Sequence, residues 1–401
     1  MDFRLLRGDC VEMMRTLPDC SVDSVVTDPP YGLSFMGHHW DYDVPGVDVW
    51  CEAMRVLKPG GHLLAFAGSR TYHRMAVNIE DAGFEIRDQI MWVYGSGFPK
   101  SMDVSKAIDK AAGAERDVTR DGNTKAAEFS GKFDNAPSST RERRDNPATE
   151  AARQWQGWGT ALKPAHEPIV VARKPLAEKT VAANVLAYGT GALNIDACRV
   201  ETDDDLNGGR YSDNKQGGDG DTYGRGINKR SALDYLQPAG RWPANLIHDG
   251  SDEVVALFPD SNGSGGSVPN VKITGYGDKN VGTGKAEYFG GPRTKVNSGT
   301  GTAARFFYAA KASKKDRGEG NTHPTVKPVA VCEYLQRLVT PPGGVTLDMY
   351  CGSGSFGVSA MENGFSYIGI DRDADADGNA LGYLEIARRR ILYAQCEASG
   401  L

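Results

Sequence analysis

The sequence lacks the marks of secreted, membrane-spanning and zinc-binding proteins. Its seven cysteines are scattered, with no CxxC pair and no cysteine–histidine cluster. That spacing argues against structural zinc and a disulfide framework, and it favours free thiols in a reducing compartment. No run of 18 or more apolar residues occurs, and no apolar segment follows the first residues, so we expect neither membrane spanning nor secretion. These absences together predict a cytoplasmic protein.

An excess of basic residues is also missing. The 46 lysines and arginines are outnumbered by 52 aspartates and glutamates, which leaves a net charge of −6 over 401 residues. Residues 100–330 are less acidic than either end of the chain, and a local positive face can bind phosphates whatever the total charge. Composition therefore neither supports nor excludes nucleic acid as a partner. The length favours one large domain with a second module.

The first hundred residues alternate between apolar runs and segments with helical spacing. Lys58-Pro59-Gly60-Gly61 is expected to end a helix in a turn. Alternating strands and helices indicate a parallel, doubly wound α/β sheet. The pattern predicts strands at 3–6, 22–27, 61–67 and 85–93 and helices at 10–17, 47–56 and 71–82.

The middle of the chain is less regular than its two ends. Residues 101–158 form a charged stretch, and residues 181–330 are rich in glycine with little periodicity. The second of these indicates a loop-rich recognition module or partial disorder, apart from compact pieces at 242–258 and 303–312. Further strands are predicted at 167–172, 345–350 and 365–371, and further helices at 329–338 and 380–394.

The tetrapeptide Asp28-Pro29-Pro30-Tyr31 follows the apolar run 22–27 and has the strongest chemical signal. The amino group of a nucleic-acid base is a poor nucleophile because its lone pair is conjugated into the ring. A carboxylate (Asp28) and a carbonyl held rigidly by prolines (Pro29) can each accept one N–H and favour tetrahedral geometry at the nitrogen. Tyr31 offers a flat face for an extruded base. An ordinary strand-ending turn is the alternative.

Two further motifs indicate a cofactor site. An apolar strand leads into a Gly-x-Gly loop, and an acid, Asp371, ends the next strand. Glycines let the backbone approach a ligand closely, and such an acid can bind ribose hydroxyls, so a dinucleotide remains an alternative on this feature alone. The run His323-Pro324-Thr325-Val326-Lys327-Pro328 could hold the carboxylate of an amino-acid-like cofactor or form a polar turn.

In their order along the chain, the runs TDPPYG, HPTVKP and LDMYCGSGSFG with IGID resemble the β-class of DNA amino-methyltransferases. The resemblance covers residues 1–100, 160–175 and 320–395. It implies a Rossmann-like, mostly parallel sheet with circularly permuted strand order and a loop-rich inserted target-recognition region. It divides the chain into a catalytic half at 1–180 with an insertion at 101–158, a target-recognition region at 181–320 and a half that binds S-adenosyl-L-methionine at 321–401. The sequence departs from the family at Met349-Tyr350, where Pro-Phe is common, and at Ser355-Phe356, where Thr-Thr is common.

The resemblance also implies roles for the residues that match its motifs. Asp28, Pro29 and Tyr31 would activate and stack the base, and Asp28 and Pro30 would approach the cofactor. Thr325 and Lys327 would hold the carboxylate of the cofactor, Asp371 its ribose, and Asp9 with Cys10 its adenine ring. His166-Glu167 resembles the last-strand motif of the family. The amino-acid moiety would lie against Asp348, Cys351, Gly352, Ser353, Gly354 and Ser355, with Tyr350 and Arg372 as further cofactor-binding candidates.

Candidates for DNA contact come from segments outside these motifs. Trp155 and Trp158 could stack on bases or be buried anchors. A basic run beside Phe306-Phe307-Tyr308 could line a phosphate-contacting edge or be a solvated helix end. We expect no metal, because no ligands cluster in sequence and the chemistry needs none. The candidates are His39, Trp40, Arg153, Trp158, Lys311, Lys314 and Lys315.

The sequence therefore predicts a bacterial or phage enzyme that methylates N6 of a flipped adenine in double-stranded DNA, and family analogy adds a homodimer. Within the family, Asp at the first tetrapeptide position favours adenine and Ser favours cytosine N4, so cytosine-N4 methylation remains an alternative. Methylation of RNA or a protein amide is disfavoured by the order of the motifs. A non-catalytic DNA-binding regulator is disfavoured by the intact Asp28 and Tyr31. A nicotinamide-dependent oxidoreductase is suggested by the glycine loop alone.

Overall fold

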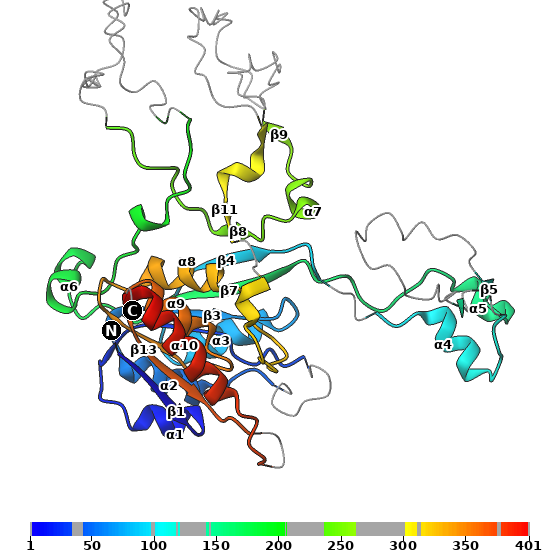
Figure 1. The fold of residues 1–401 in the computed structure, drawn as a ribbon, viewed down its shortest axis with the longest axis horizontal. Helices are drawn as coiled ribbons and strands as arrows, with labels where there is room; N and C mark the ends of the chain where they lie inside the picture. Colours follow the sequence, from blue (N-terminus) through cyan, green and yellow to red (C-terminus); the bar gives the residue numbers. More distant parts are fainter. Residues whose placement is uncertain are drawn as a thin grey trace, which may run out of the picture. The chain divides into compact units, whose positions relative to one another are not determined.

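The computed structural model describes two compact parts of the chain (Figure 1). The larger unit comprises Met1–Gly95 with His166–Leu401, and the smaller unit comprises Ser96–Ala165. Among the described residues, no helix is long and apolar enough to cross a membrane. The described residues are 2–33, 43–97, 101–117, 119–120, 142–143, 146–204, 206, 236–261, 301–310, 314–374 and 378–399.

A nine-stranded sheet forms the centre of the larger unit, in the order β1-β13-β12-β2-β3-β7-β4-β8-β11. β7 runs antiparallel to both of its neighbours, and the other pairs are parallel. β1 pairs with β13, so the two ends of the chain meet in one sheet, which confirms the permuted strand order. The strands are β1 (Phe3–Arg7), β2 (Val22–Thr27), β3 (Leu57–Phe66), β4 (Glu85–Val93), β7 (His166–Arg173), β8 (Leu246–His248), β11 (Tyr308–Ala309), β12 (Val345–Asp348) and β13 (Ser366–Asp371).

Helices cover both faces of this sheet, as the doubly wound expectation requires. Successive strand residues point to opposite faces, so Val25 packs with one helical layer and Val26 with the other. Both layers are apolar, which buries the sheet on each side. One layer contains α1 (Cys10–Arg15), α2 (Val47–Val56) and α3 (Tyr72–Asp81), and the other contains α8 (Val329–Val339), α9 (Ser355–Glu362) and α10 (Tyr383–Ser399).

The turn predicted at residues 58–61 is wrong. These residues belong to β3, which begins directly after α2, and the pairing of β2 with β3 shifts register there. Gly60 allows this irregularity because it takes a left-handed φ of 78°. The freed Pro59 carbonyl accepts hydrogen bonds from Asn184 Nδ2 (2.9 Å) and Thr190 Oγ1 (2.6 Å).

The segment 181–330 contains more regular structure than its composition indicated. α6 (Val181–Tyr188) begins at a Thr180 cap, whose side chain accepts from Ala183 N, and ends at Gly189 with a φ of 76°. These are ordinary helix signals that were missed because the helix is short. β8 and β11 extend the main sheet beyond β4. The remaining elements here are η4 (Asp196–Cys198), α7 (Asp252–Val255), β9 (Asp260–Ser261) paired with β10 (Gly301–Thr302), η6 (Ala303–Phe306) and η7 (Lys314–Arg317).

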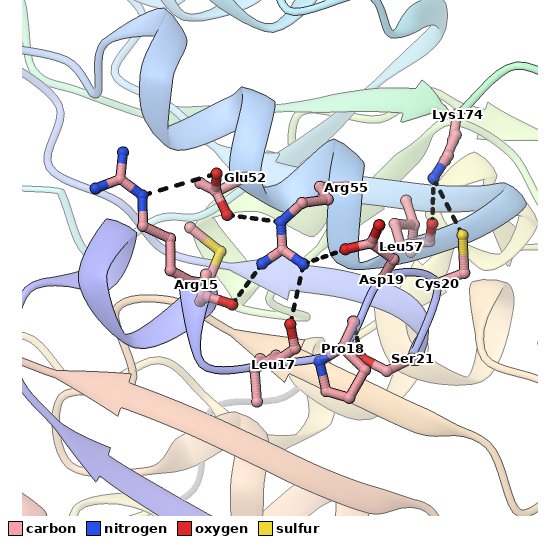
Figure 2. A network of polar contacts seen from close by, with 11 residues as sticks. Arg15, Leu17, Pro18, Asp19, Cys20, Ser21, Glu52, Arg55, Leu57 and Lys174 are labelled. Carbon is pink, nitrogen blue, oxygen red and sulfur yellow. Dashed lines mark hydrogen bonds and ion pairs between the residues drawn. The ribbon is translucent and has the colours of Figure 1, made fainter.

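A polar network holds the loop that leads into β2 (Figure 2). The Arg55 guanidinium of α2 donates to the carbonyls of Met14 (2.7 Å) and Leu17 (2.9 Å) and to the Asp19 carboxylate (2.5 Å). On the same side, Lys174 donates to the Leu57 carbonyl at 2.6 Å. These contacts tie α1 to α2, and they anchor the start of the strand that carries the tetrapeptide.

The smaller unit is a separate, mainly helical insertion between β4 and β7. Its centre is the buried Asp109 carboxylate, which pairs with Arg116 at 2.6 Å and accepts from Thr149 Oγ1 at 2.7 Å. The predicted insertion at 101–158 lies within the sequence range of this unit. Its elements are α4 (Val104–Ala111), α5 (Glu150–Gln154), and β5 (Thr119–Arg120) paired with β6 (Glu142–Arg143).

Candidate active site

The tetrapeptide and the glycine loop lie side by side in the sheet. They follow β2 and β12, which are parallel neighbours, so their carboxyl ends meet at one edge. Thr27 Oγ1 donates to Asp348 Oδ1 at 2.7 Å and links the two strand ends directly. The helices that follow these strands, α2 and α9, cover opposite faces of the sheet. This is the topological switch point at which open α/β sheets bind their ligands.

Four polar side chains form one cluster beside the tetrapeptide. The Tyr31 hydroxyl lies 2.7 Å from Asp28 Oδ1 and 2.9 Å from Glu167 Oε2. Lys327 Nζ lies 2.8 Å from Glu167 Oε2, 3.0 Å from the Tyr31 hydroxyl and 3.1 Å from Asp28 Oδ2. The side chains are 12–19% exposed for Lys327, Asp28 and Glu167. The residues come from the end of β2, the start of β7 and the segment before α8.

The charges in this cluster depend on one another. Burial raises the pKa of Asp28, and the Lys327 ammonium opposes that rise. Burial alone would lower the pKa of Lys327, but Asp28 and Glu167 raise it above its ordinary value. Burial and the two nearby carboxylates raise the pKa of the Tyr31 hydroxyl well above its usual range. Lys327 is therefore an ammonium and Tyr31 a neutral phenol, and both contact the carboxyl groups of Asp28 and Glu167.

Aromatic rings surround the ammonium. Lys327 Nζ lies 4.7 Å from the ring centre of Phe66, 5.4 Å from that of Tyr31 and 6.0 Å from that of Trp92. Tyr94 packs against Trp92 with ring centres 5.0 Å apart, and burial together with Glu167 raises the pKa of Tyr94 to about 12. Flat faces that can stack a base and favour a cation thus lie beside the acceptors.

The glycine loop after β12 is held by backbone groups. Gly352 N donates to Asp371 Oδ2 at 2.8 Å, which connects the ends of β12 and β13. Gly354 has a φ of 79°, and a Cβ there would lie 2.8 Å from the Cβ of Ala387 in α10. The loop can therefore turn sharply into α9 and pack against α10 only with glycine at this position.

Asp348 lies beneath this loop. Its carboxylate accepts from Thr27 Oγ1, from Tyr350 N at 3.1 Å and from the Tyr367 hydroxyl at 3.2 Å, and the residue is 1% exposed. Burial raises the pKa of Asp348 to about 7. Its described contacts are internal, so the structure gives it the position of a support for the loop.

The segments expected to bind the nucleoside part of a cofactor also gather at this edge. Pairing of Arg7 with Asp371 brings the Gly8–Cys10 turn beside the end of β13. Asp9 caps α1 by accepting from Val11 N at 3.0 Å, and its other oxygen accepts from Arg372 at 2.9 Å. Cys10 Sγ lies 3.5 Å from the Tyr350 hydroxyl. The proximity of these residues is established, and their individual roles remain predictions.

The run 323–328 divides between the two parts of the site. Lys327 points into the cluster with Asp28, whereas Thr325 is exposed and its backbone carbonyl lies 2.6 Å from His323 Nδ1. His323 lies against the glycine loop, since a Cβ on Gly352 would be 2.7 Å from its Nε2. The contacts of Lys327 are thus with Glu167 and the tetrapeptide, while the resemblance implied a contact with the cofactor.

Two functional candidates escaped the sequence reading. Arg390 of α10 donates to the Ser353 carbonyl at 2.5 Å and to Ser353 Oγ at 3.1 Å, so it holds the glycine loop from outside. It belongs to a run of three arginines, and no local signal distinguishes the half-buried Arg390 from its two exposed neighbours. Glu167 belongs to the last-strand motif of the family resemblance, which implies no role for it, although a carboxylate at the start of an apolar strand is a signal in itself.

The residues expected to contact DNA are mostly untested. His39, Trp40 and Lys311 lie outside the described residues, as do the side chains of Lys314 and Lys315. In the smaller unit, Arg153 pairs with Glu150 at 2.9 Å. Trp155 and Trp158 pack edge to face with ring centres 5.0 Å apart and are 43% and 59% exposed. The interpretation of these tryptophans as buried anchors is therefore wrong. Among the described residues, no group of three or more His, Cys, Asp or Glu side chains could hold a metal ion.

Several known proteins resemble this chain. M.HinfI, a type II methyltransferase of Haemophilus influenzae, is 28% identical over 109 residues, which are 22% of this chain and 30% of that protein. The chain spans about a third of the length of the curated relatives it matches. A DNA modification methylase of Thermus thermophilus, solved in complex with S-adenosyl-L-methionine, has 14% identity and a TM-score of 0.41 over 98% of this chain and 94% of that one.

A further solved structure, the cytosine-N4-specific PvuII DNA methyltransferase, has 12% identity and a TM-score of 0.42 over 98% of this chain and 93% of that one. At these TM-scores the structural likeness assigns nothing to this chain by itself. A family model described as DNA methylase, N6_N4_Mtase, matches residues 22–376. Because that match spans most of the chain and includes all three motifs at the switch point, this protein belongs to the N6/N4 DNA methylase family.

Proposed function

We propose that this protein methylates the N6 amino group of adenine in double-stranded DNA, with S-adenosyl-L-methionine as the methyl donor. The observation that carries the proposal is the position of Asp28 and Tyr31 next to the glycine loop across the β2–β12 pair. An acceptor for a base amine and a site for a nucleoside cofactor thus share one edge of the sheet.

The residues at the glycine loop fit such a cofactor. Asp371 Oδ2 accepts from Gly352 N and Oδ1 from Asp373 N, so each oxygen uses one of its two lone pairs on the backbone. The remaining lone pairs can accept ribose hydroxyls. Asp9 and Cys10 lie beside them on the side proposed for the adenine ring. When bound, the cofactor supplies a methyl group on a positively charged sulfur.

The tetrapeptide prepares the amine. Asp28 and the Pro29 carbonyl each accept one N–H, which draws the nitrogen lone pair out of conjugation with the ring. The base is extruded from the duplex to reach them and stacks on the aromatic faces beside Lys327. Asp28 is also the acceptor for the proton that the amine loses after transfer. Asp at this position supports adenine over cytosine by family resemblance.

Mass spectrometry of nucleosides from DNA of an expressing host tests the proposal. We expect N6-methyladenine with the wild-type chain and with Asp81→Ala, a control at an exposed carboxylate of α3, and none with Asp28→Ala. If N4-methylcytosine alone were found, the substrate would be cytosine N4, with the same two acceptors for its amino group. Unmodified DNA would overturn the function. Sequencing that detects modified bases would identify the target site.

We also propose a homodimer, from family analogy. Sedimentation of the protein with and without DNA measures this directly, and a mass of one chain under both conditions would contradict it.

A further inference from the structure

Glu167 brings a second carboxylate to the lysine that pairs with the catalytic one. We propose, resting on the function above, that Glu167 is a positioning residue for methyl transfer. Because Glu167 and Asp28 both pair with Lys327, the ammonium does not neutralise Asp28 completely. The amine of the target base therefore faces an Asp28 carboxylate that keeps part of its negative charge.

The donors of Lys327 are all used inside the cluster. An ammonium has three N–H donors and no acceptor. Its three nearest acceptors are Glu167 Oε2 at 2.8 Å, the Tyr31 hydroxyl at 3.0 Å and Asp28 Oδ2 at 3.1 Å. The contact to Glu167 is the shortest, so Glu167 keeps the ammonium from pairing with Asp28 alone.

The charge of the cluster follows from its members. Asp28 and Glu167 contribute two negative charges and Lys327 one positive charge, which leaves one negative charge at a site where each side chain is less than a fifth exposed. Without Glu167, Asp28 and Lys327 would form a neutral pair. Besides its own members Asp28, Tyr31, Glu167 and Lys327, the titratable groups that interact electrostatically with this cluster are Tyr94, His323, Cys332 and Asp348.

The reaction needs that remaining negative charge. Methyl transfer forms an N–C bond with the amine lone pair, while the C–S bond breaks and its electron pair stays on sulfur. The amine nitrogen becomes positive and then loses one proton to Asp28, from which it passes to solvent. A positive charge that develops beside a net negative cluster in a low-dielectric site is stabilised, whereas beside a neutral pair it is not.

Single-turnover methylation of a DNA duplex containing the identified site, at saturating cofactor and DNA and over pH 6–9, tests the inference. The variants are Glu167→Gln, Lys327→Met and the double variant. Glu85→Gln is the matched control, because Glu85 lies on β4 at the opposite end of the same strand pair and binds Arg173 at 2.6 Å. Thermal melting and the Kd of the cofactor are measured for each.

We expect Glu167→Gln to slow transfer by about tenfold to 100-fold, the effect of one or two pKa units of charge interaction, with little change in cofactor Kd. Lys327→Met leaves two buried carboxylates that share a proton. Its rate at pH 7 therefore falls by about 100-fold and recovers as the pH rises. The double variant has no second carboxylate to share a proton with Asp28, so Asp28 is a free acceptor and transfer at pH 7 is faster than in Lys327→Met. Glu85→Gln keeps the wild-type rate.

Three results would overturn the inference. The first is a Glu167→Gln rate equal to the wild-type rate across the pH range. The second is a double variant whose loss equals the product of the two single losses. The third is a Lys327→Met variant that weakens the cofactor Kd but has a normal rate at saturation, because Lys327 would then bind the cofactor. If the wild-type chain methylates no DNA, the proposed function fails instead.

Discussion

The two sides of the site differ in the chemical groups that form them. The side proposed for the base consists of charged and aromatic side chains, with Asp28, Tyr31, Glu167 and Lys327 in mutual contact. The side proposed for the cofactor consists largely of backbone, with Gly352 N bound to Asp371 and the loop held through the Ser353 carbonyl. Substitutions on the first side should therefore change rates and pH profiles, whereas substitutions on the second should change binding and stability.

The base side is tested by Asp28→Ala. We expect the single-turnover rate to fall by about 10²- to 10³-fold, the usual cost of removing one preorganised electrostatic partner of a transition state. The cofactor Kd should change by less than about threefold, because the described contacts of Asp28 are with Tyr31 and Lys327. If Asp28→Ala instead lost much of its cofactor affinity and kept a normal rate, the division of the site into a base side and a cofactor side would be wrong.

Asp348, which supports the cofactor side, is tested through pH. Burial raises its pKa to about 7, above the ordinary value of 3.8, so the folded chain keeps a proton that the unfolded chain releases. This contribution to stability is complete below about pH 4 and is lost as the pH rises through about 7. Asp348→Asn removes the titrating group.

We therefore expect the free energy of unfolding of Asp348→Asn, relative to the wild type, to increase by about 4 kcal/mol between pH 4 and pH 8. Denaturant melts of both proteins at each pH measure it. A constant difference across that range would mean that Asp348 is ionised in the folded state.

The glycine loop is tested by Gly354→Ala. A left-handed φ of 79° and a Cβ placed 2.8 Å from Ala387 should together cost about 2 kcal/mol of stability and weaken cofactor binding. Gly364→Ala is the matched control, because Gly364 has a φ of 78° but open space around it. Equal losses for the two variants, measured by thermal melting and titration, would show that backbone strain alone accounts for the effect.

The smallest effect is expected at Arg390. Arg390→Lys keeps the charge but loses the guanidinium that contacts Ser353 through Nη1 and the Asp316 carbonyl through Nη2, so we expect about 1 kcal/mol of destabilisation and a few-fold weaker cofactor binding. Arg389, which is exposed on the same helix, supplies the control Arg389→Lys. A change in the transfer rate at saturating cofactor, without a change in cofactor affinity, would instead group Arg390 with the residues on the side proposed for the base.

Local patterns were enough to predict most of the central sheet. The boundaries of β2, α2 and β4 agree with the expectation, because apolar runs and helical spacing report burial within a single segment. The residues of both motifs were recognisable in the sequence, and the permuted order of their strands followed from the family resemblance. The turn predicted at 58–61 is wrong because a bulged strand depends on a partner far along the chain. The helix α6 was not predicted because it is short, although its cap residues are local signals.

Tertiary structure alone decided which charges meet. Lys327 lies 160 residues after Glu167 and 299 after Asp28. Glu167 reaches the edge where β2 ends because β7 runs antiparallel between β3 and β4. A sequence motif identifies chemical groups by residue type and spacing. The hydrogen-bond acceptors of a buried ammonium depend instead on which residues the fold places around it. The residues proposed to bind a cofactor and a base could therefore be selected from the sequence, while the pairing of Lys327 with Asp28 and Glu167 required the fold.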